Sequence, residues 1–200
     1  TFDGPTGLRP YCDLMLGNDD FVYGTASEGG SSHGVVFKIA QDGSGFTVLH
    51  AFNGVLGSQP RAGVIEGSDG FLYGTTYKTS ASNNGVVYRV AKDGTGFSVL
   101  YAFSGADGGK VYAGVVEGSD GFLYGNTETG GANGSGVLFR VAKDGTGFSV
   151  LHSFVSATGI APWGSPIEGS DGDLYGTATG GGPDNSGVVF RIAKNGTGYT

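Results

Sequence analysis

A short motif, Leu-Tyr-Gly or Val-Tyr-Gly, recurs at nearly constant intervals, and this repeat limits the possible folds more than any other feature. Its tyrosine is found at four positions, spaced 50, 51 and 51 residues apart: Tyr23, Tyr73, Tyr124 and Tyr175. Repeats of this length predict one small supersecondary unit per copy. Such a unit cannot bury its own apolar faces, so each copy must stack on its neighbours.

Each copy contains four short apolar runs separated by turn sequences. In the second copy the runs are Ala62–Glu66, Phe71–Tyr77, Gly85–Ala91 and Phe97–Phe103. They are rich in β-branched and aromatic residues and too short for typical helices. The Asp-Gly pairs between the first and second runs, and between the third and fourth, supply the positive φ angles of tight hairpins. We therefore predict four antiparallel strands per copy, named a to d, and an all-β fold: a β-propeller with four blades per chain.

The repeat also sets the expected boundaries. We predict a single domain over residues 1–200, with blades at about 12–52, 62–103, 113–154 and 164–200, the last completed by residues 1–3. This split blade suits a ring that closes by pairing its ends, or a chain cut from a longer array. The sequence opens inside a repeat, so any targeting segment would lie outside it. Because sheets pack with less strain when more of them share the circle, we expect a two-fold homodimer that completes an eight-bladed ring.

Composition excludes several classes of function. The formal net charge is −7 and Lys and Arg form no cluster, so nucleic-acid binding is not expected. No apolar run approaches the ~20 residues of a membrane helix. The single cysteine, Cys12, allows no internal disulfide and no cysteine-based zinc site, and is expected to be a buried thiol.

The combination of motifs resembles a known family. Asp-Gly-Phe-Leu-Tyr-Gly, Gly-Val-Val-Tyr-Arg-Val and Asp-Gly-Thr-Gly-Phe recur with small changes along essentially the whole chain. They are similar to the GloVer tandem repeat of bacterial surface and secreted proteins. The resemblance implies a propeller and an extracytoplasmic location, and it implies no reaction or cofactor. The chain departs from the pattern at Asp20, Asp173 and Asn195, changes that we expect the turns to tolerate.

Comparison of the copies indicates which end of the blades could bind a ligand. The a–b and c–d turns are nearly identical in all copies, whereas the b–c loops and the d–a connections differ. These two variable classes emerge at the same end, here called the divergent-loop face, where binding specificity can change without altering the scaffold. The b–c loops each carry one charged residue, and these are candidate ligand contacts: Glu28, Lys78, Glu128 and Asp184.

A second set of candidates occupies one position of the d–a connection. It consists of three aromatic residues and an arginine directly before strand a, expected near the mouth of a central channel: Tyr11, Arg61, Tyr112 and Trp163. Rings above a mouth lined with hydroxyls and amides could stack on sugars. Alternatively, these side chains close the channel and pack on one another.

Other recurring polar residues are interpreted as structural. Glu66, Glu117 and Glu168 could form a ring of carboxylates around a cation. Arg89, Arg140 and Arg191 recur alongside them, so we favour ion pairs with these arginines and predict no metal site. His50 and His152 share their position with Tyr101, which indicates an aromatic packing slot rather than a catalytic base.

No catalytic motif is present, so enzymatic activity is not expected, although acids from separate blades could still converge. The leading hypothesis is a non-enzymatic scaffold or binding propeller whose ligand is a polysaccharide or other glycan. The alternatives are a purely structural, self-assembling repeat protein and a polysaccharide lyase or hydrolase.

Overall fold

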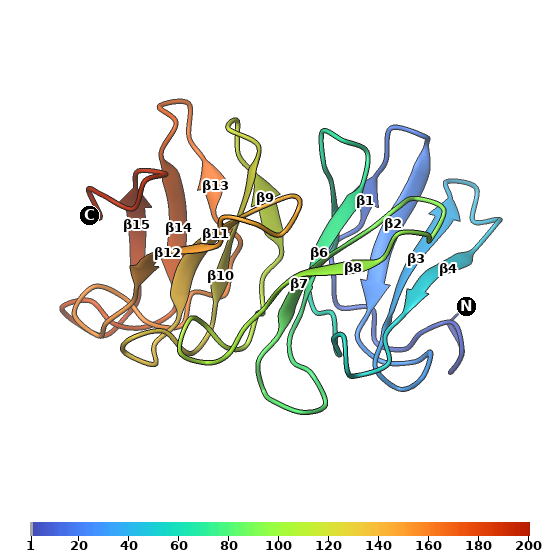
Figure 1. Ribbon diagram of the computed structural model, residues 1–200, viewed down its shortest axis with the longest axis horizontal. Coiled ribbons are helices and arrows are strands. Elements are labelled where there is room, and N and C mark those ends of the chain that lie inside the picture. Colours follow the sequence, from blue (N-terminus) through green and yellow to red (C-terminus); the bar gives the residue numbers. More distant parts are fainter. Residues whose placement is uncertain (1) are drawn as a thin grey trace. The chain divides into compact units, whose positions relative to one another are not determined.

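The computed structural model describes residues 2–200, which form two compact units: one ends at Val99 and the other comprises Leu100–Thr200. The first unit contains two antiparallel meanders (Figure 1). The first sheet has the order β1-β2-β3-β4 and the second β5-β6-β7-β8, with β8 crossing the boundary between the units. The strands are β1 (Met15–Leu16), β2 (Phe21–Ala26), β3 (Val35–Ala40), β4 (Thr47–Ala51), β5 (Ile65–Glu66), β6 (Leu72–Thr76), β7 (Val86–Val90) and β8 (Ser98–Ala102).

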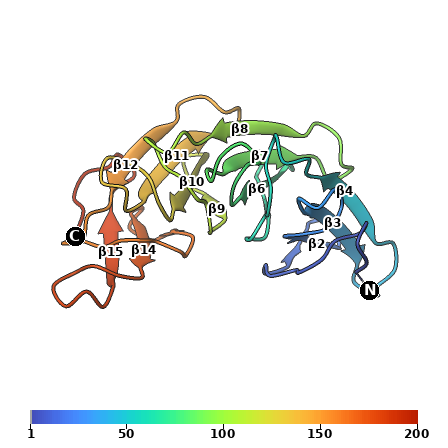
Figure 2. The same ribbon diagram turned by 90° about the horizontal axis from the view of Figure 1, so that it is seen from below.

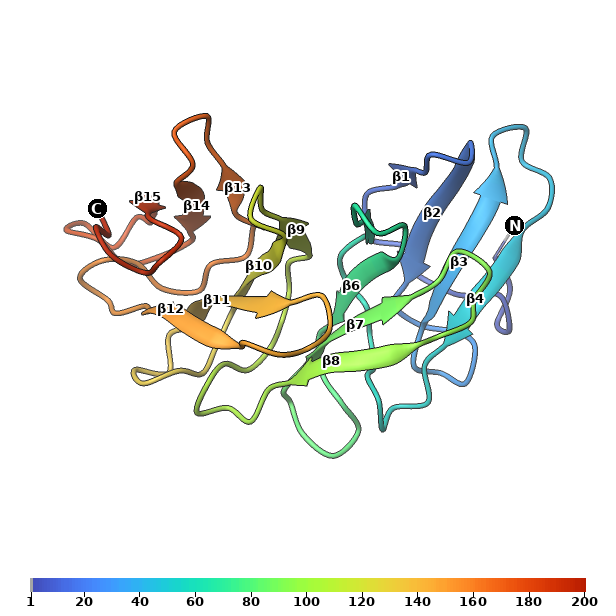
Figure 3. The ribbon, with the colours of Figure 1, turned by 45° about the horizontal axis from the view of Figure 1, so that its top comes forward.

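The second unit repeats this arrangement. Its sheets have the orders β9-β10-β11-β12 and β13-β14-β15. A fourth chain segment begins to pair with β15, where Arg191 and Thr200 exchange two backbone hydrogen bonds of 2.9 and 3.0 Å. The strands are β9 (Val115–Glu117), β10 (Phe122–Thr127), β11 (Val137–Ala142), β12 (Ser149–Ser153), β13 (Ile167–Glu168), β14 (Leu174–Ala178) and β15 (Val188–Ile192). The predicted all-β propeller with hairpin-built blades is confirmed, and Figure 2 and Figure 3 show the neighbouring strands of each blade side by side.

The turns explain why these residues form hairpins. Gly70 adopts a φ of 81° in the a–b turn of the second blade, where a side chain would be strained. In the first blade Asp20 takes the same left-handed conformation at a φ of 65°, so the turn survives the loss of glycine. In the c–d turns, Asp93 Oδ1 accepts hydrogen bonds from the Thr95 backbone N–H (2.9 Å) and hydroxyl (2.7 Å). Asn195 Oδ1 accepts the equivalent pair from Thr197, at 3.0 and 2.7 Å, which is why this departure leaves the turn intact.

The apolar core lies between consecutive blades. Because side chains alternate across a strand, Tyr23 and Val36 project from one side of the first blade, here called the forward side. They are fully buried in a cluster with Leu72, Tyr88 and other residues of the second blade. The second unit has the equivalent cluster between the third and fourth blades, from Tyr124 and Leu138 on one side to Leu174, Phe190 and Ile192 on the other. Neither sheet of a pair could bury these faces alone, as the repeat predicts.

Aromatic rings extend this packing at the outer strands. His50 on β4 stacks on Phe97 with ring centroids 3.6 Å apart and planes 3° from parallel. His152 stacks on Tyr199 at 3.8 Å, and Tyr101 on Phe148 at 3.5 Å. The predicted aromatic slot shared by histidine and tyrosine is confirmed. Burial in this slot lowers the pKa of His50 to about 4 and also lowers that of His152, since desolvation disfavours the charged imidazole.

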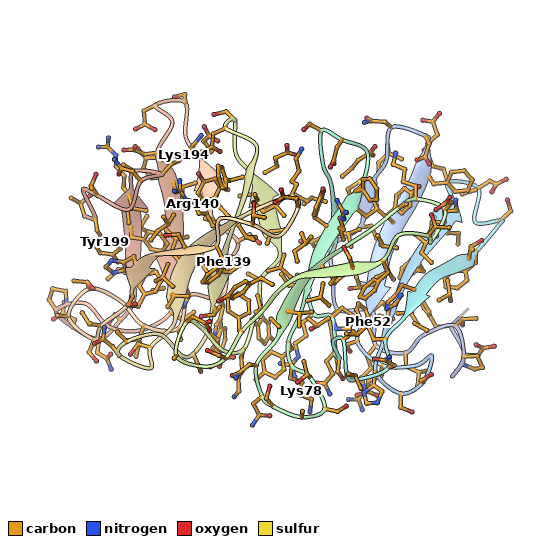
Figure 4. The ribbon with its side chains drawn as sticks, viewed as in Figure 1. Phe52, Lys78, Phe139, Arg140, Lys194 and Tyr199 are labelled. Atoms are coloured by element: carbon orange, nitrogen blue, oxygen red, sulfur yellow. The ribbon has the colours of Figure 1, made fainter. Side chains whose placement is uncertain are left out.

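A polar contact, here called the junction latch, accompanies each of these interfaces at the a–b turns. In the first unit Glu66 of the second blade accepts a hydrogen bond from the Asn18 backbone N–H (3.0 Å), and Lys92 lies 2.5 Å from Glu66 and 3.5 Å from Asp19. In the second unit Glu168 accepts hydrogen bonds from the backbone N–H and hydroxyl of Ser119, at 2.7 and 2.6 Å. There Lys194, labelled in Figure 4, lies 2.5 Å from Glu168 and 4.0 Å from Asp120.

The prediction that these glutamates pair with the recurring arginines is therefore wrong. Their partners are lysines, and Glu117 follows the same rule with Lys143 at 2.7 Å. Arg89 and Arg140 instead lie over the rings of Phe71 and Phe122, at 4.9 and 4.8 Å. In the antiparallel register Arg89 is opposite Tyr73, whereas Glu66 lies at the edge of the sheet beside the turn of the preceding blade. Among residues 2–200, no group of three or more acidic, histidine or cysteine side chains is arranged to bind a metal ion.

Candidate functional site

The divergent-loop face consists of loops that are fixed to the blades by backbone pairing. In the first unit Leu8 pairs with Glu28 through hydrogen bonds of 2.6 and 3.0 Å, and Ser58 pairs with Lys78 through bonds of 2.7 and 3.2 Å. In the second unit Ile160 and Gly180 form the same bridge. Each bridge joins a d–a connection to the b–c loop that follows it. The two variable classes of loop therefore form one continuous surface in the first, second and fourth blades, which loop composition alone did not reveal.

The four residues at the shared d–a position have different environments. In the second unit the rings of Tyr112 and Trp163 lie 5.5 Å apart and 17° from parallel. Trp163 is 48% exposed and Tyr112 is 37% exposed, so this stacked pair keeps much of its apolar surface in solvent. In the first unit Tyr11 is exposed, whereas Arg61 lies over the ring of Tyr77 at 3.7 Å. Of the predicted set, the structure thus brings Tyr112 and Trp163 together.

Tyr77 is a candidate residue that the sequence analysis missed. It begins the b–c loop of the second blade, at the position held by Ser27, Glu128 and Thr179 in the other copies. Only the second copy has an aromatic residue at this position, and this difference from the other copies is visible in the sequence. Its contact with Arg61, across 16 residues of sequence, depends on the pairing of the two loops and could not be read from the spacing.

The four charged residues of the b–c loops do not form one cluster. Glu28 forms an ion pair with Arg9 at 2.7 Å. Lys78 lies on the loop between β6 and β7, at the divergent-loop end of the first unit (Figure 4). Glu128 has one buried carboxylate oxygen, and Asp184 is an exposed residue of the last b–c loop. Each is a local feature of its own blade.

A polar pocket of about 490 Å³ lies between the loops of the first and second blades, inside the first unit. Its wall contains a hydrogen bond of 3.1 Å between His33 Nδ1 and the hydroxyl of Ser58, a buried residue. The remaining lining side chains are hydroxyl, amide, methyl and ammonium groups: Ser32, Gln59, Lys78, Thr79, Ser80, Ala81, Ser82 and Asn83. This lining offers hydrogen-bond donors and acceptors to a hydroxyl-rich ligand and one positive charge.

The pocket has only part of the geometry of a nucleophilic site. A serine nucleophile needs a base that is oriented by a third group, and it must face the substrate. The Ser58 residue is 2% exposed, and its backbone N–H is committed to Lys78. The His33–Ser58 contact therefore acts as a fixed part of the wall.

Comparison with known proteins agrees with the architecture. A family model described as the Gloeobacter/Verrucomicrobia repeat matches residues 9–200. No curated protein sequence matches the chain. Among solved structures, β-propellers resemble it, including a nidogen–laminin complex (TM-score 0.67, 14% identity, covering 95% of this chain and 63% of that one).

Two bacterial proteins give similar matches. The extracellular domain of a protein described as a hybrid two-component system from B. thetaiotaomicron has a TM-score of 0.64 and 14% identity, covering 96% of this chain and 22% of that one. A gluconolactonase from Xanthomonas campestris has a TM-score of 0.59 and 15% identity, covering 92% of this chain and 58% of that one. The chain spans less than two thirds of each of these structures, and identities this low are evidence for the fold alone.

Proposed function

The chain belongs to the Gloeobacter/Verrucomicrobia repeat family, and we propose that it is a non-enzymatic β-propeller binding module whose divergent-loop face takes carbohydrate. The β-propeller fold supports a role as a scaffold or binding module. The loops at this face are fixed by backbone bridges, so ligand groups on them are preorganised.

The observation that carries the proposal is the exposed stacked pair of Tyr112 and Trp163. Two rings that are 17° from parallel present a broad apolar platform, and nearly half of the tryptophan surface is in contact with solvent. The apolar faces of sugar rings stack on such platforms, while their hydroxyls reach neighbouring polar groups. The hydroxyl-lined pocket beside Lys78 in the first unit provides a second surface of matching chemistry.

A lyase or hydrolase is the less supported candidate. Glycoside hydrolysis needs two carboxyl groups on either side of the bond that is cleaved. Of the loop acids, Glu28 is engaged by Arg9, and Glu128 and Asp184 belong to separate blades. The other candidate is a purely structural role, in which Tyr112 and Trp163 pack on each other and bind no ligand.

We further propose an extracytoplasmic protein that forms a homodimer with an eight-bladed ring. The family resemblance and the extracellular domain among the similar structures support the location. No helix of the described chain has the length and apolar character to cross a membrane. That the four blades form a single domain also stays a prediction.

Binding of soluble neutral and acidic polysaccharides, measured by glycan array and then by calorimetry, tests the function. We expect wild type to bind at least one of them, and Trp163→Ala and Tyr112→Ala each to weaken that binding about tenfold or more, as hot-spot aromatic residues do. Leu56→Ala is the matched control, because it removes an exposed apolar side chain from a d–a connection without removing a ring. No binding by wild type, or equal binding by all variants, would refute the proposal.

A further inference from the structure

One face of the fourth blade and one face of the first blade carry exposed apolar residues at positions that are buried in other blades. On the forward side of the fourth blade Val189 is 76% exposed, although its repeat equivalent in the first blade, Val36, is fully buried. On the opposite side of the first blade Leu14 is 61% exposed, whereas its equivalent in the second blade, Val64, is 3% exposed. The two faces are thus the two halves of the blade-to-blade interface.

We infer that the forward side of the fourth blade docks, head to tail, on the open face of the first blade of a second copy. This inference rests on the proposed homodimer and adds to it the surfaces, their orientation and the chemistry of the contact. The two surfaces differ, so each copy uses both. Two such contacts related by a two-fold axis close a ring.

The face of the first blade is already arranged for this partner. Phe2 lies on Phe37 with ring centroids 5.2 Å apart and planes at 72°. The interface between the first and second blades repeats this contact, where Phe52 lies on Tyr88 at 5.2 Å and 70°. Phe2 thus takes the place of a preceding blade's phenylalanine, and the incoming copy would continue an interface that the chain has begun.

The ring stacking that joins consecutive blades is incomplete at this face of the first blade. Phe97, Phe148 and Tyr199 each stack on a ring of the preceding blade, at 3.5 to 3.8 Å. Their equivalent Phe46 contacts Phe37 and Phe2, and no third ring lies on it among residues 2–200. Beside it is an apolar groove of about 420 Å³, lined by Phe2, Pro10, Cys12, Leu14, Phe37, Ile39 and Phe46.

The face of the fourth blade has the complementary form. Ile167 and Val189 are exposed on its forward side, and Tyr175 occupies the position of the buried Tyr23. The Tyr175 hydroxyl donates to Asp171 at 2.7 Å, as Tyr23 donates to Asp19 at 2.7 Å. The tyrosine is therefore held in the orientation that it has in a covered interface, before any partner arrives.

The proposed contact between two copies differs from the interfaces between consecutive blades of one chain, because it cannot form the junction latch. The latch needs a glutamate and a lysine on the following blade, and the first blade has Leu16 and Gln41 at those positions. On the fourth blade Asp171 lies 3.5 Å from Arg191 of its own sheet. The docked surfaces are therefore apolar and lack the ion pairs, so association should be weaker than the interior contacts and should not weaken with added salt.

Light scattering and sedimentation equilibrium over a range of concentrations test the inference. We expect wild type to have twice the mass of the chain, and Val189→Asp and Leu14→Asp each to raise the dissociation constant at least tenfold. Mixing these two variants should restore a fraction of dimer, because one of the two contacts then joins two unmutated faces. Val55→Asp, at an exposed residue of a d–a connection, is the control and should dimerise like wild type.

A gain-of-function variant provides the converse test. Leu16→Glu combined with Gln41→Lys supplies the missing latch residues opposite Ser170 and Asp171. We expect dimerisation at least fivefold tighter than wild type, and we expect high salt to remove the gain. Circular dichroism and thermal melts should show that every variant remains folded, since all altered side chains except Gln41 were chosen as exposed apolar residues.

The outcomes separate this inference from the homodimer itself. If wild type and the latch variant both remain monomeric, both proposals fail. If wild type dimerises and the two aspartate variants do so equally well, the homodimer stands and these docking surfaces are wrong. Larger assemblies that Val189→Asp abolishes would support the contact and refute the closed two-fold ring.

Discussion

The interface between the first and second blades and the interface between the third and fourth blades are built to the same plan with different residues. Both bury a phenylalanine on the next blade's aromatic ring, and both end in a glutamate–lysine latch at the preceding a–b turn. They differ where a side chain of the preceding blade reaches a backbone carbonyl of the next. Thr25 donates to Ala62 O at 2.9 Å in one, and Asn126 to Gly164 O at 2.8 Å in the other.

The divergent-loop face varies far more between the same two units. The first unit has a hydroxyl-lined pocket and an arginine on a tyrosine, and the second has the stacked Tyr112–Trp163 pair. The comparison indicates that packing limits the choice of residues at the interfaces and leaves it open at the loops. Repeats in one chain can thus keep one scaffold while changing its surface chemistry.

The largest expected effect tests whether the two interfaces are equally important to stability. Phe52 and Phe154 are fully buried at equivalent positions, so Phe52→Ala and Phe154→Ala should each lower the free energy of unfolding by about 3–5 kcal/mol. Urea unfolding followed by circular dichroism measures this. The conservative Phe→Leu variants are the controls and should recover much of the loss. If one alanine variant costs under about 1 kcal/mol, the interfaces are not equivalent.

A smaller effect is expected at the latch. Lys92→Met and Lys194→Met keep the aliphatic stem but leave Glu66 or Glu168 without its cation, at a cost of about 1–3 kcal/mol each. Thermal melts at low and high salt would show the loss. Lys110→Met, at a lysine outside the latch, is the control. Equal melting temperatures for the latch variants and wild type would show that the latch contributes nothing measurable to the stability of the protein.

The strand pattern of the repeat was readable from sequence because local signals agreed. In the second copy the predicted runs contain all four observed strands, β5 to β8. The Asp-Gly turns, the short runs rich in β-branched and aromatic residues and the 50-residue interval each predicted the same hairpins. The turn at Asp20 held without glycine because aspartate tolerates a positive φ better than most residues.

Contacts between copies could not be predicted in the same way. Arginine and lysine both recur near the glutamates, and sequence spacing does not say which of them reaches the neighbouring blade. The antiparallel register decides it, by placing Arg89 opposite Tyr73 and Lys92 beside the turn of the preceding blade. At the candidate site, the shared d–a position was recognised, but only the folded loops show that Trp163 meets Tyr112 while Arg61 meets Tyr77.

The smallest expected effect concerns the ring-stacking slot, where one unit's histidine can be replaced by the residue that another copy already uses. Burial lowers the pKa of His50 to about 4, from 6.5 in the unfolded chain. Between these two pKa values the unfolded state binds more protons than the folded state. The stability gained from a neutral His50 is therefore complete above about pH 6.5 and is lost as the pH falls toward 4.

His50→Tyr copies Tyr101, whose ring stacks on Phe148 in the same way, and it should make stability less dependent on pH in this window. Urea midpoints at pH 7.5, 6 and 5 measure the change. His33→Tyr, at the loop histidine outside the slot, is the control, and a His50→Tyr profile parallel to wild type would show that the slot does not keep the imidazole neutral.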